Sequence, residues 1–183
     1  MTTKEKFEKY IMGTYTRQDV CLDRGIKEKV YDEAGKQYID FGSGIGTNSL
    51  GICDDRWVSY VCNQAHKIQH TSNLYYNAPQ ADVAENLCER TGYSKVFFGN
   101  SGAEANECAI KLARKYSFDK YGKGRHNIIT LVNSFHGRTL TTLSATGQDV
   151  FHNYFFPFTE GFIYVEANNI DDLKAKLDDT VCA

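Results

Sequence analysis

From residue 80 onward, short apolar segments alternate with longer segments of helical periodicity, and this alternation constrains the fold more than any other feature. The expected strands and helices, in chain order, are 95–98, 102–120, 127–132, 138–145, 162–165 and 170–177. Strands that alternate with helices in this way are typical of a largely parallel sheet. The sequence therefore predicts an α/β fold for this part of the chain.

The amino-terminal third has a different pattern. A short helix is expected at 3–12, and β-forming residues over 20–41 predict a meander of short strands with a turn at 33–36. A glycine-rich stretch follows, and then two helices that begin near Asp54 or Asp55 and at Pro79. We expect an amino-terminal segment at 1–54 and an α/β domain at 55–183 that is incomplete at its carboxyl end.

Composition and charge exclude several classes of protein. The hydrophobic fraction is 42%, the charged fraction is 24% and the net charge is −2, so the chain resembles globular proteins and gives no electrostatic reason to bind nucleic acid. No apolar run reaches membrane-spanning length, and the first residues lack the apolar stretch of a signal peptide, which favours a cytoplasmic location. Six cysteines without a C-x-x-C pair favour reduced thiols, with no metal site.

The segment Phe97–Glu107 carries the strongest chemical signal. An apolar stretch runs into the turn Gly99-Asn100-Ser101-Gly102, and a helix begins at once. Ser101 and Glu104 have the spacing of a capping box, and the helix start offers free N–H groups beside small residues. These properties suit a phosphate group. A capped helix with a purely structural role fits the same residues equally well.

A second turn, Asn133–Thr139, follows the expected strand 127–132 at its carboxyl end, where α/β proteins place their ligands. Phe135 could cover a flat ring, and Arg138 could form a bidentate pair with a carboxylate. The alternative is a core phenylalanine and a surface arginine. His136 could act as a general base, although a packing or hydrogen-bonding role is more usual for a lone histidine beside glycine.

Taken together, the two turns resemble the class III, ornithine-type aminotransferases of the fold-type I pyridoxal-phosphate superfamily. The runs Asn100–Glu107 and Phe135–Thr139 carry this resemblance, and Tyr38–Gly51 is similar to the family's entry segment. The run His70–Tyr76 is similar to the acetylornithine branch. The resemblance covers nearly the whole chain and implies a truncated fold-type I structure, in which residues 1–54 form part of the small domain.

The resemblance also implies roles for individual residues. Ser101, Gly102 and Ala103 would hold the phosphate of pyridoxal 5′-phosphate, Phe135 would lie against its pyridine ring, and Arg138 would receive a substrate carboxylate. The implied reaction moves the amino group of N-acetylornithine to 2-oxoglutarate, a step of arginine biosynthesis, in a cytoplasmic homodimer. Ornithine, succinylornithine and 4-aminobutyrate aminotransferases remain alternatives within the family.

The carboxyl end favours truncation, because Val181-Cys182-Ala183 looks like the start of another buried strand. By the resemblance, the Schiff-base lysine and the aspartate that pairs with the pyridine nitrogen would lie beyond Ala183. We therefore expect no catalytic residue in this chain and no transamination by the chain alone. A non-catalytic fragment or a partner-binding chain is the alternative of another class.

Overall fold

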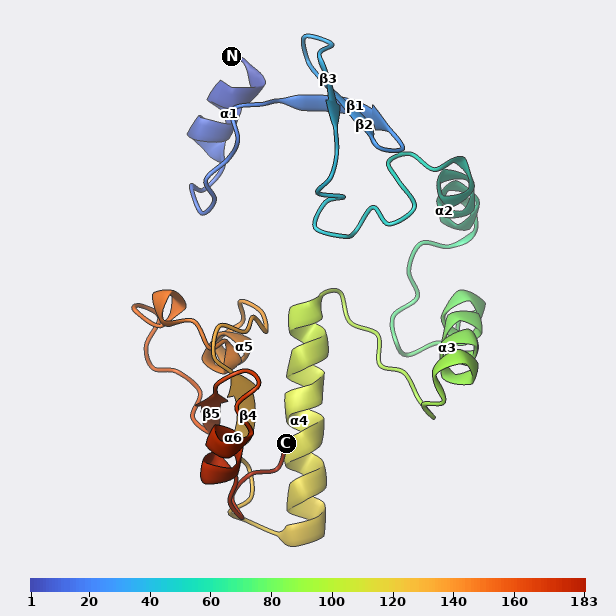
Figure 1. The fold of residues 1–183 in the computed structure, drawn as a ribbon. Helices are drawn as coiled ribbons and strands as arrows, with labels where there is room; N and C mark the ends of the chain where they lie inside the picture. The colour runs from blue at the N-terminus through green and yellow to red at the C-terminus, as the bar shows by residue number, and fades with distance from the viewer. The chain divides into compact units, whose positions relative to one another are not determined.

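The computed structural model describes residues 1–183, which form two compact units, Met1–Ala78 and Pro79–Ala183 (Figure 1). This division reflects contacts within the chain. The boundary expected at 54/55 refers instead to the domains of a longer protein, and it stays a prediction. None of the helices is both long enough and apolar enough to cross a bilayer.

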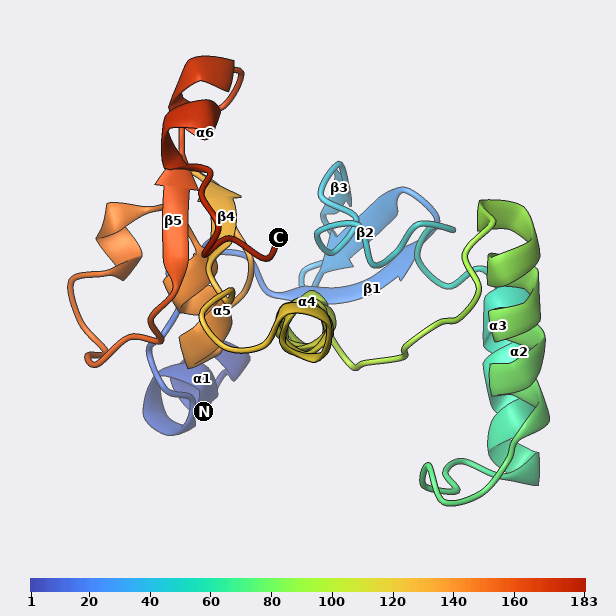
Figure 2. The ribbon, with the colours of Figure 1, turned by 90° about the horizontal axis from the view of Figure 1, so that it is seen from below.

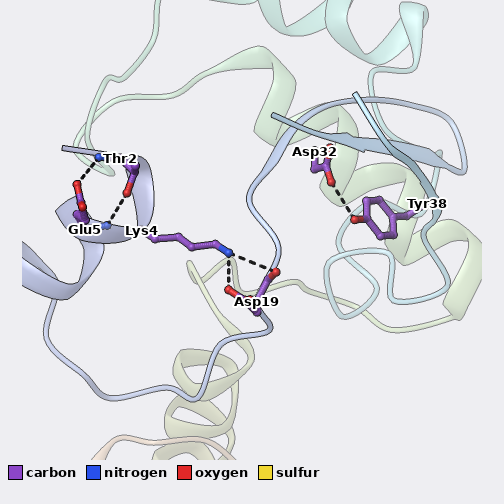
Figure 3. A network of polar contacts seen from close by, with 6 residues as sticks. All are labelled: Thr2, Lys4, Glu5, Asp19, Asp32 and Tyr38. Carbon is purple, nitrogen blue, oxygen red and sulfur yellow. Dashed lines mark hydrogen bonds and ion pairs between the residues drawn. The ribbon is translucent and has the colours of Figure 1, made fainter. Parts of the chain in front are cut away.

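The first unit begins with α1 (Thr3–Tyr10), which the sequence predicted. Thr2 caps this helix, because its hydroxyl accepts the N–H of Glu5 at 3.2 Å (Figure 3). The Glu5 carboxylate accepts the N–H of Thr2 in return at 2.7 Å, which completes a capping box. Two of the N–H groups that a helix start leaves open are thereby satisfied.

The predicted meander is confirmed as a three-stranded antiparallel sheet in the order β1 (Leu22–Ile26), β2 (Lys29–Asp32) and β3 (Gln37–Ile39). Asp32 organises the turn between β2 and β3. Its carboxylate accepts the N–H groups of Lys36 at 2.9 Å and Ala34 at 3.0 Å. It also accepts the hydroxyl of Tyr38 at 2.9 Å (Figure 3). The Lys36 N–H and then the Tyr38 hydroxyl lower the pKa of Asp32.

The two helices expected near Asp54 and Pro79 are α2 (Asp55–Lys67), in the first unit, and α3 (Ala78–Thr91), at the start of the second. Asp54 is the N-cap of α2, since its carboxylate accepts the N–H of Trp57 at 3.1 Å. The strand expected at 95–98 was wrong: no other segment of the chain pairs with these residues. An apolar run becomes a strand only when a neighbour satisfies its backbone groups.

In the second unit, the long helix α4 (Gly102–Tyr121) precedes a small parallel sheet of β4 (Ile128–Leu131) and β5 (Phe162–Val165). The two strands pair in parallel from Ile128↔Phe162 to Leu131↔Val165, as the alternating pattern predicted (Figure 2). The other edge of β4 meets the end of the chain, where Ile129 donates to the carbonyl of Ala183 at 2.9 Å. A parallel bridge joins Asn127 to Val181, so the final residues do continue the sheet.

Three shorter helices complete this unit: α5 (Leu140–Ala145), the 3₁₀ turn η1 (Asp149–Phe151) and α6 (Ile170–Lys176). The core is centred on Ile110 of α4, Ile128 of β4 and Ala145 of α5, with Phe162 and Cys182 packed against it. The core therefore joins α4, α5 and the sheet into one body.

The buried face of α4 is not the face that its clearest apolar repeat marks. Six small or apolar residues recur at helical spacing on one face of α4: Ala105, Cys108, Ala109, Leu112, Ala113 and Tyr116. Instead Ile110 and Ser117, one heptad apart, are the buried residues, while Leu112 is 66% exposed. Ser117 is tolerated there because its hydroxyl donates to the carbonyl of Arg125 at 2.7 Å. Apolar residues occupy more than one face of α4, so periodicity alone could not select the buried one.

Candidate functional site

Ser101 begins α4 as its N-cap, with extended backbone angles (φ −153°, ψ 163°). Its hydroxyl oxygen accepts the N–H of Glu104 at 3.2 Å, as the expected capping box requires. The reciprocal half of that box is absent, because the Glu104 carboxylate accepts the main-chain N–H of Asn100 and its side-chain amide (3.3 Å), not the N–H of Ser101. Glu104 thus ties the preceding turn down to the helix.

The start of α4 faces open space. Ser101 and Gly102 are exposed, and a Cβ placed on Gly102 would meet no atom within 4 Å. The N–H groups of Gly102 and Ala103 donate to no group of the chain, as is usual for the first turn of a helix. Unpaired N–H groups and the positive end of the helix dipole both favour an anion. The Ser101 hydroxyl also keeps its proton available for donation, since its cap bond uses only the oxygen.

The second predicted turn leaves β4 by a tight backbone path. Asn133 adopts a positive φ of 62°, and its N–H donates to the carbonyl of Gly147 at 2.6 Å. Gly137 has a φ of 136°, a conformation that glycine adopts at low cost and other residues do not. The turn therefore reverses within a few residues and brings Gly137 back toward α4.

Three contacts hold this turn against the first two turns of α4. Gly137 lies on Ala103, with so little room that a Cβ on Gly137 would come 2.7 Å from the Cβ of Ala103. The Asn106 side-chain amide donates to the carbonyl of His136 at 2.7 Å. The hydroxyl of Thr139, the last residue of the turn, donates to the Glu107 carboxylate. The helix start and the second turn are thus one structural unit.

Helix α5 supports the turn from the other side. Thr142 and Thr146 are fully buried in a polar layer. The Thr146 hydroxyl accepts the N–H of His136 at 3.0 Å and donates to the carbonyl of Thr142 at 2.9 Å. Both backbone groups of His136 are therefore fixed, one by α4 and the other by α5. This agrees with a structural role for position 136, which the sequence had left open beside a general-base role.

The structure brings some of the predicted site residues together. Ser101 and Gly102 are exposed at the helix start, and the half-buried Ala103 touches the turn that carries Phe135 and Arg138. Phe135 is 58% exposed in this structure. Arg138 is also exposed. The roles proposed for all five residues toward a ligand stay predictions.

Sequence reasoning missed the residues that join the two turns. Asn106 and Glu107 follow Ala103 at the i+3 and i+4 positions, so the three share one face of α4. That spacing was the available signal, but two polar residues in a helix more often face solvent. Thr139 was also missed: it caps α5 and accepts the N–H of Thr142 at 3.2 Å.

A cavity lies elsewhere, in the first unit. Its volume is about 750 Å³, and it is lined by α1 and by residues 11–22, among them Phe7, Tyr15 and Leu22. None of the predicted site residues lines it. The start of α4 is an open surface and not an enclosed pocket, so the chemistry of its groups, and not a cavity, identifies the candidate site.

Comparison with known proteins agrees with this geometry. The family model described as "Aminotransferase class-III" matches residues 12–183, and the chain belongs to this family. The acetylornithine aminotransferase of Haemophilus ducreyi is 53% identical over 175 residues, which are 95% of this chain and 44% of that protein. The acetylornithine aminotransferase of Caldanaerobacter subterraneus is 50% identical over the whole chain and 46% of its own length. The chain thus spans less than half the length of these relatives.

Solved structures give the same result for the fold. The ornithine aminotransferase of Toxoplasma gondii superposes with a TM-score of 0.92 at 30% identity, over 98% of this chain and 43% of that one. The omega transaminase of Pseudomonas jessenii, solved in complex with PMP, has a TM-score of 0.83 at 28% identity, over 91% of this chain and 39% of that one. The predicted class, part of a fold-type I aminotransferase of mixed α/β structure, is confirmed.

Proposed function

We propose that this chain provides the phosphate-binding part of a pyridoxal 5′-phosphate site in an aminotransferase. The observation that carries this proposal is the exposed start of α4, where the N–H groups of Gly102 and Ala103 are unpaired and Gly102 faces open space. A phosphate ester fits such a site, because two N–H groups, a hydroxyl and a helix dipole all favour its negative charge.

The remaining predicted residues would act around this anchor. Phe135, exposed on the turn that touches Ala103, would cover one face of the pyridine ring. The Arg138 guanidinium would pair with a substrate carboxylate and orient the substrate. When bound, the cofactor supplies an electron sink, and the residues of this chain bind and orient.

For the substrates, we propose N-acetylornithine as amino donor and 2-oxoglutarate as acceptor, a reaction that serves arginine biosynthesis. The support is the identity of 53% and 50% to two acetylornithine aminotransferases, against 30% to the ornithine aminotransferase of known structure. By the same family relation we propose a homodimer in the cytoplasm. The proposed domains are residues 1–54, in the small domain, and 55–183, in the large cofactor-binding domain.

Binding to the 183-residue chain tests the cofactor site directly. Pyridoxamine 5′-phosphate is a better probe than pyridoxal 5′-phosphate, because it lacks the aldehyde that would react with lysine side chains. We expect calorimetric titration to show that the chain binds this probe more tightly than pyridoxamine, which lacks the phosphate. Equal affinity for the two compounds would contradict a phosphate site at Ser101–Ala103.

Activity needs the rest of the family fold, which a chimera can supply. In this chimera the chain replaces the matched segment of the relative that is 53% identical. We expect transfer of the amino group of N-acetylornithine to 2-oxoglutarate, with a kcat/KM well above that for ornithine. A chimera that prefers ornithine or 4-aminobutyrate would contradict the proposed donor while leaving the phosphate site intact.

A further inference from the structure

The amide of Asn106 donates to the carbonyl of His136, and this hydrogen bond links the second turn of α4 to the main chain of the turn carrying Phe135 and Arg138. We propose that Asn106 is a positioning residue: it fixes that turn beside the helix start so that Phe135 can contact the ring of a ligand whose phosphate is held at Ser101–Ala103. This inference rests on the function proposed above.

The geometry of the bond supports this role. It measures 2.7 Å, is partly buried and connects residues 30 positions apart in the sequence. A side-chain amide that donates a hydrogen bond to a distant main-chain carbonyl restrains the position of that main chain. The carbonyl of His136 would have no other protein donor if Asn106 were replaced, and an unpaired, partly buried carbonyl is unfavourable.

The surroundings explain why the effect would be local. Thr146 still holds the N–H of His136 at 3.0 Å, and the Thr139–Glu107 contact still joins the two segments. Loss of the Asn106 amide would therefore free only the carbonyl of His136, next to the contact of Gly137 with Ala103, while the other contacts of the turn remain. The helix start Ser101–Ala103, the phosphate cup, would itself stay intact, because none of its N–H groups depends on Asn106.

Two probes separate the cup from the ring contact: inorganic phosphate, which uses only the helix start, and pyridoxamine 5′-phosphate, which also needs the turn. Both are titrated into the 183-residue chain and its variants. For Asn106→Ala we expect unchanged phosphate affinity and an affinity for pyridoxamine 5′-phosphate that falls about three- to tenfold, the usual size of one aromatic ring contact.

A double-mutant cycle gives the decisive readout, since a merely structural role would not couple the two residues. If Asn106 acts through Phe135, the variant Asn106→Ala/Phe135→Ala binds pyridoxamine 5′-phosphate no more weakly than Phe135→Ala alone. Additive losses would overturn the proposal. Equal weakening of both probes would also overturn it, because the effect would then lie in the cup.

Asn86→Ala is the matched control. The Asn86 amide also donates to a backbone carbonyl, that of Asp82 at 2.9 Å, but within the exposed surface of α3. This variant should bind both probes as the unsubstituted chain does. Asn106→Leu, which keeps the branched shape of the side chain without its amide, replaces Asn106→Ala if thermal unfolding shows that the alanine variant does not fold. Failure of both variants to fold would mean that Asn106 is required for folding and would refute the positioning role. An unsubstituted chain that binds neither probe would instead contradict the proposed function itself.

Discussion

Gly137 packs on Ala103 with no space for a side chain between them. A Cβ on Gly137 would lie 2.7 Å from the Cβ of Ala103 and 2.6 Å from the hydroxyl of Thr142. The φ of 136° at Gly137 is also unfavourable for any other residue. Glycine at this position therefore sets the distance between the second turn and the start of α4.

Gly137→Ala should consequently destabilise the second unit and displace the turn. Overpacking and backbone strain together predict a loss of about 2–4 kcal/mol in the free energy of unfolding. Urea unfolding followed by circular dichroism measures this loss. Gly92→Ala serves as control: Gly92 has a φ of 75° but open space around it, so that only the backbone cost of about 1 kcal/mol applies. Equal losses for the two variants would show that the contact with Ala103 is unimportant.

Substitutions at Ser101 should separate helix capping from anion binding. Ser101→Ala removes the oxygen that accepts the N–H of Glu104 and should cost about 1 kcal/mol of stability. Ser101→Asp keeps a cap and should retain that stability, yet its carboxylate should repel phosphate at the same N–H groups. Thermal unfolding and phosphate titration of both variants test this. Phosphate binding by Ser101→Asp as strong as that of the unsubstituted chain would place the anion site elsewhere.

Asp32 should make the hairpin of β2 and β3 sensitive to acid. Hydrogen bonds from the Lys36 N–H and the Tyr38 hydroxyl lower the pKa of Asp32 from its ordinary value of 3.8. The stabilisation is therefore fully present above pH 3.8 and is lost as the pH falls through the lower, folded-state pKa. An NMR titration of this carboxyl carbon should show a midpoint below 3.8. Tyr38→Phe should raise the midpoint, and an unchanged midpoint would contradict the role of the hydroxyl.

The chain alone should not catalyse transamination, because the lysines of α4 lie along the helix, away from its start at Ser101. Lys115 pairs with Asp119 along the exposed side of α4, and Lys120 lies over the ring of Tyr116. With N-acetylornithine, 2-oxoglutarate and added pyridoxal 5′-phosphate, glutamate should form no faster than with the free cofactor. The chimera described above is the positive control. Glutamate formation by the chain that is lost in Lys115→Met would disprove the prediction.

Local signals predicted most of the fold. Caps placed α2 and α4 close to their observed starts, because Asp54 and Ser101 act on their own helix within three residues. The strand expected at 95–98 failed, since pairing depends on a partner that composition does not reveal. The apolar pattern did not identify the buried face of α4 for a similar reason, because which apolar face is covered depends on where the sheet lies.

The candidate site divides in the same way. The exposed helix start at Ser101–Ala103 follows from the sequence, because helix termini have intrinsic open donors. The link between the two turns does not, because the partner of Asn106 is a carbonyl 30 residues away and a backbone group has no sequence signature. Only the tertiary structure could reveal that contact.

That contact also bears on how the site can vary among related proteins. Asn106 and Thr146 bind the peptide groups on either side of His136, while its imidazole Nδ1 lies 3.4 Å from the hydroxyl of Ser134 in the same turn. The attachment of this turn to α4 and α5 therefore uses backbone groups that any residue except proline would supply at position 136.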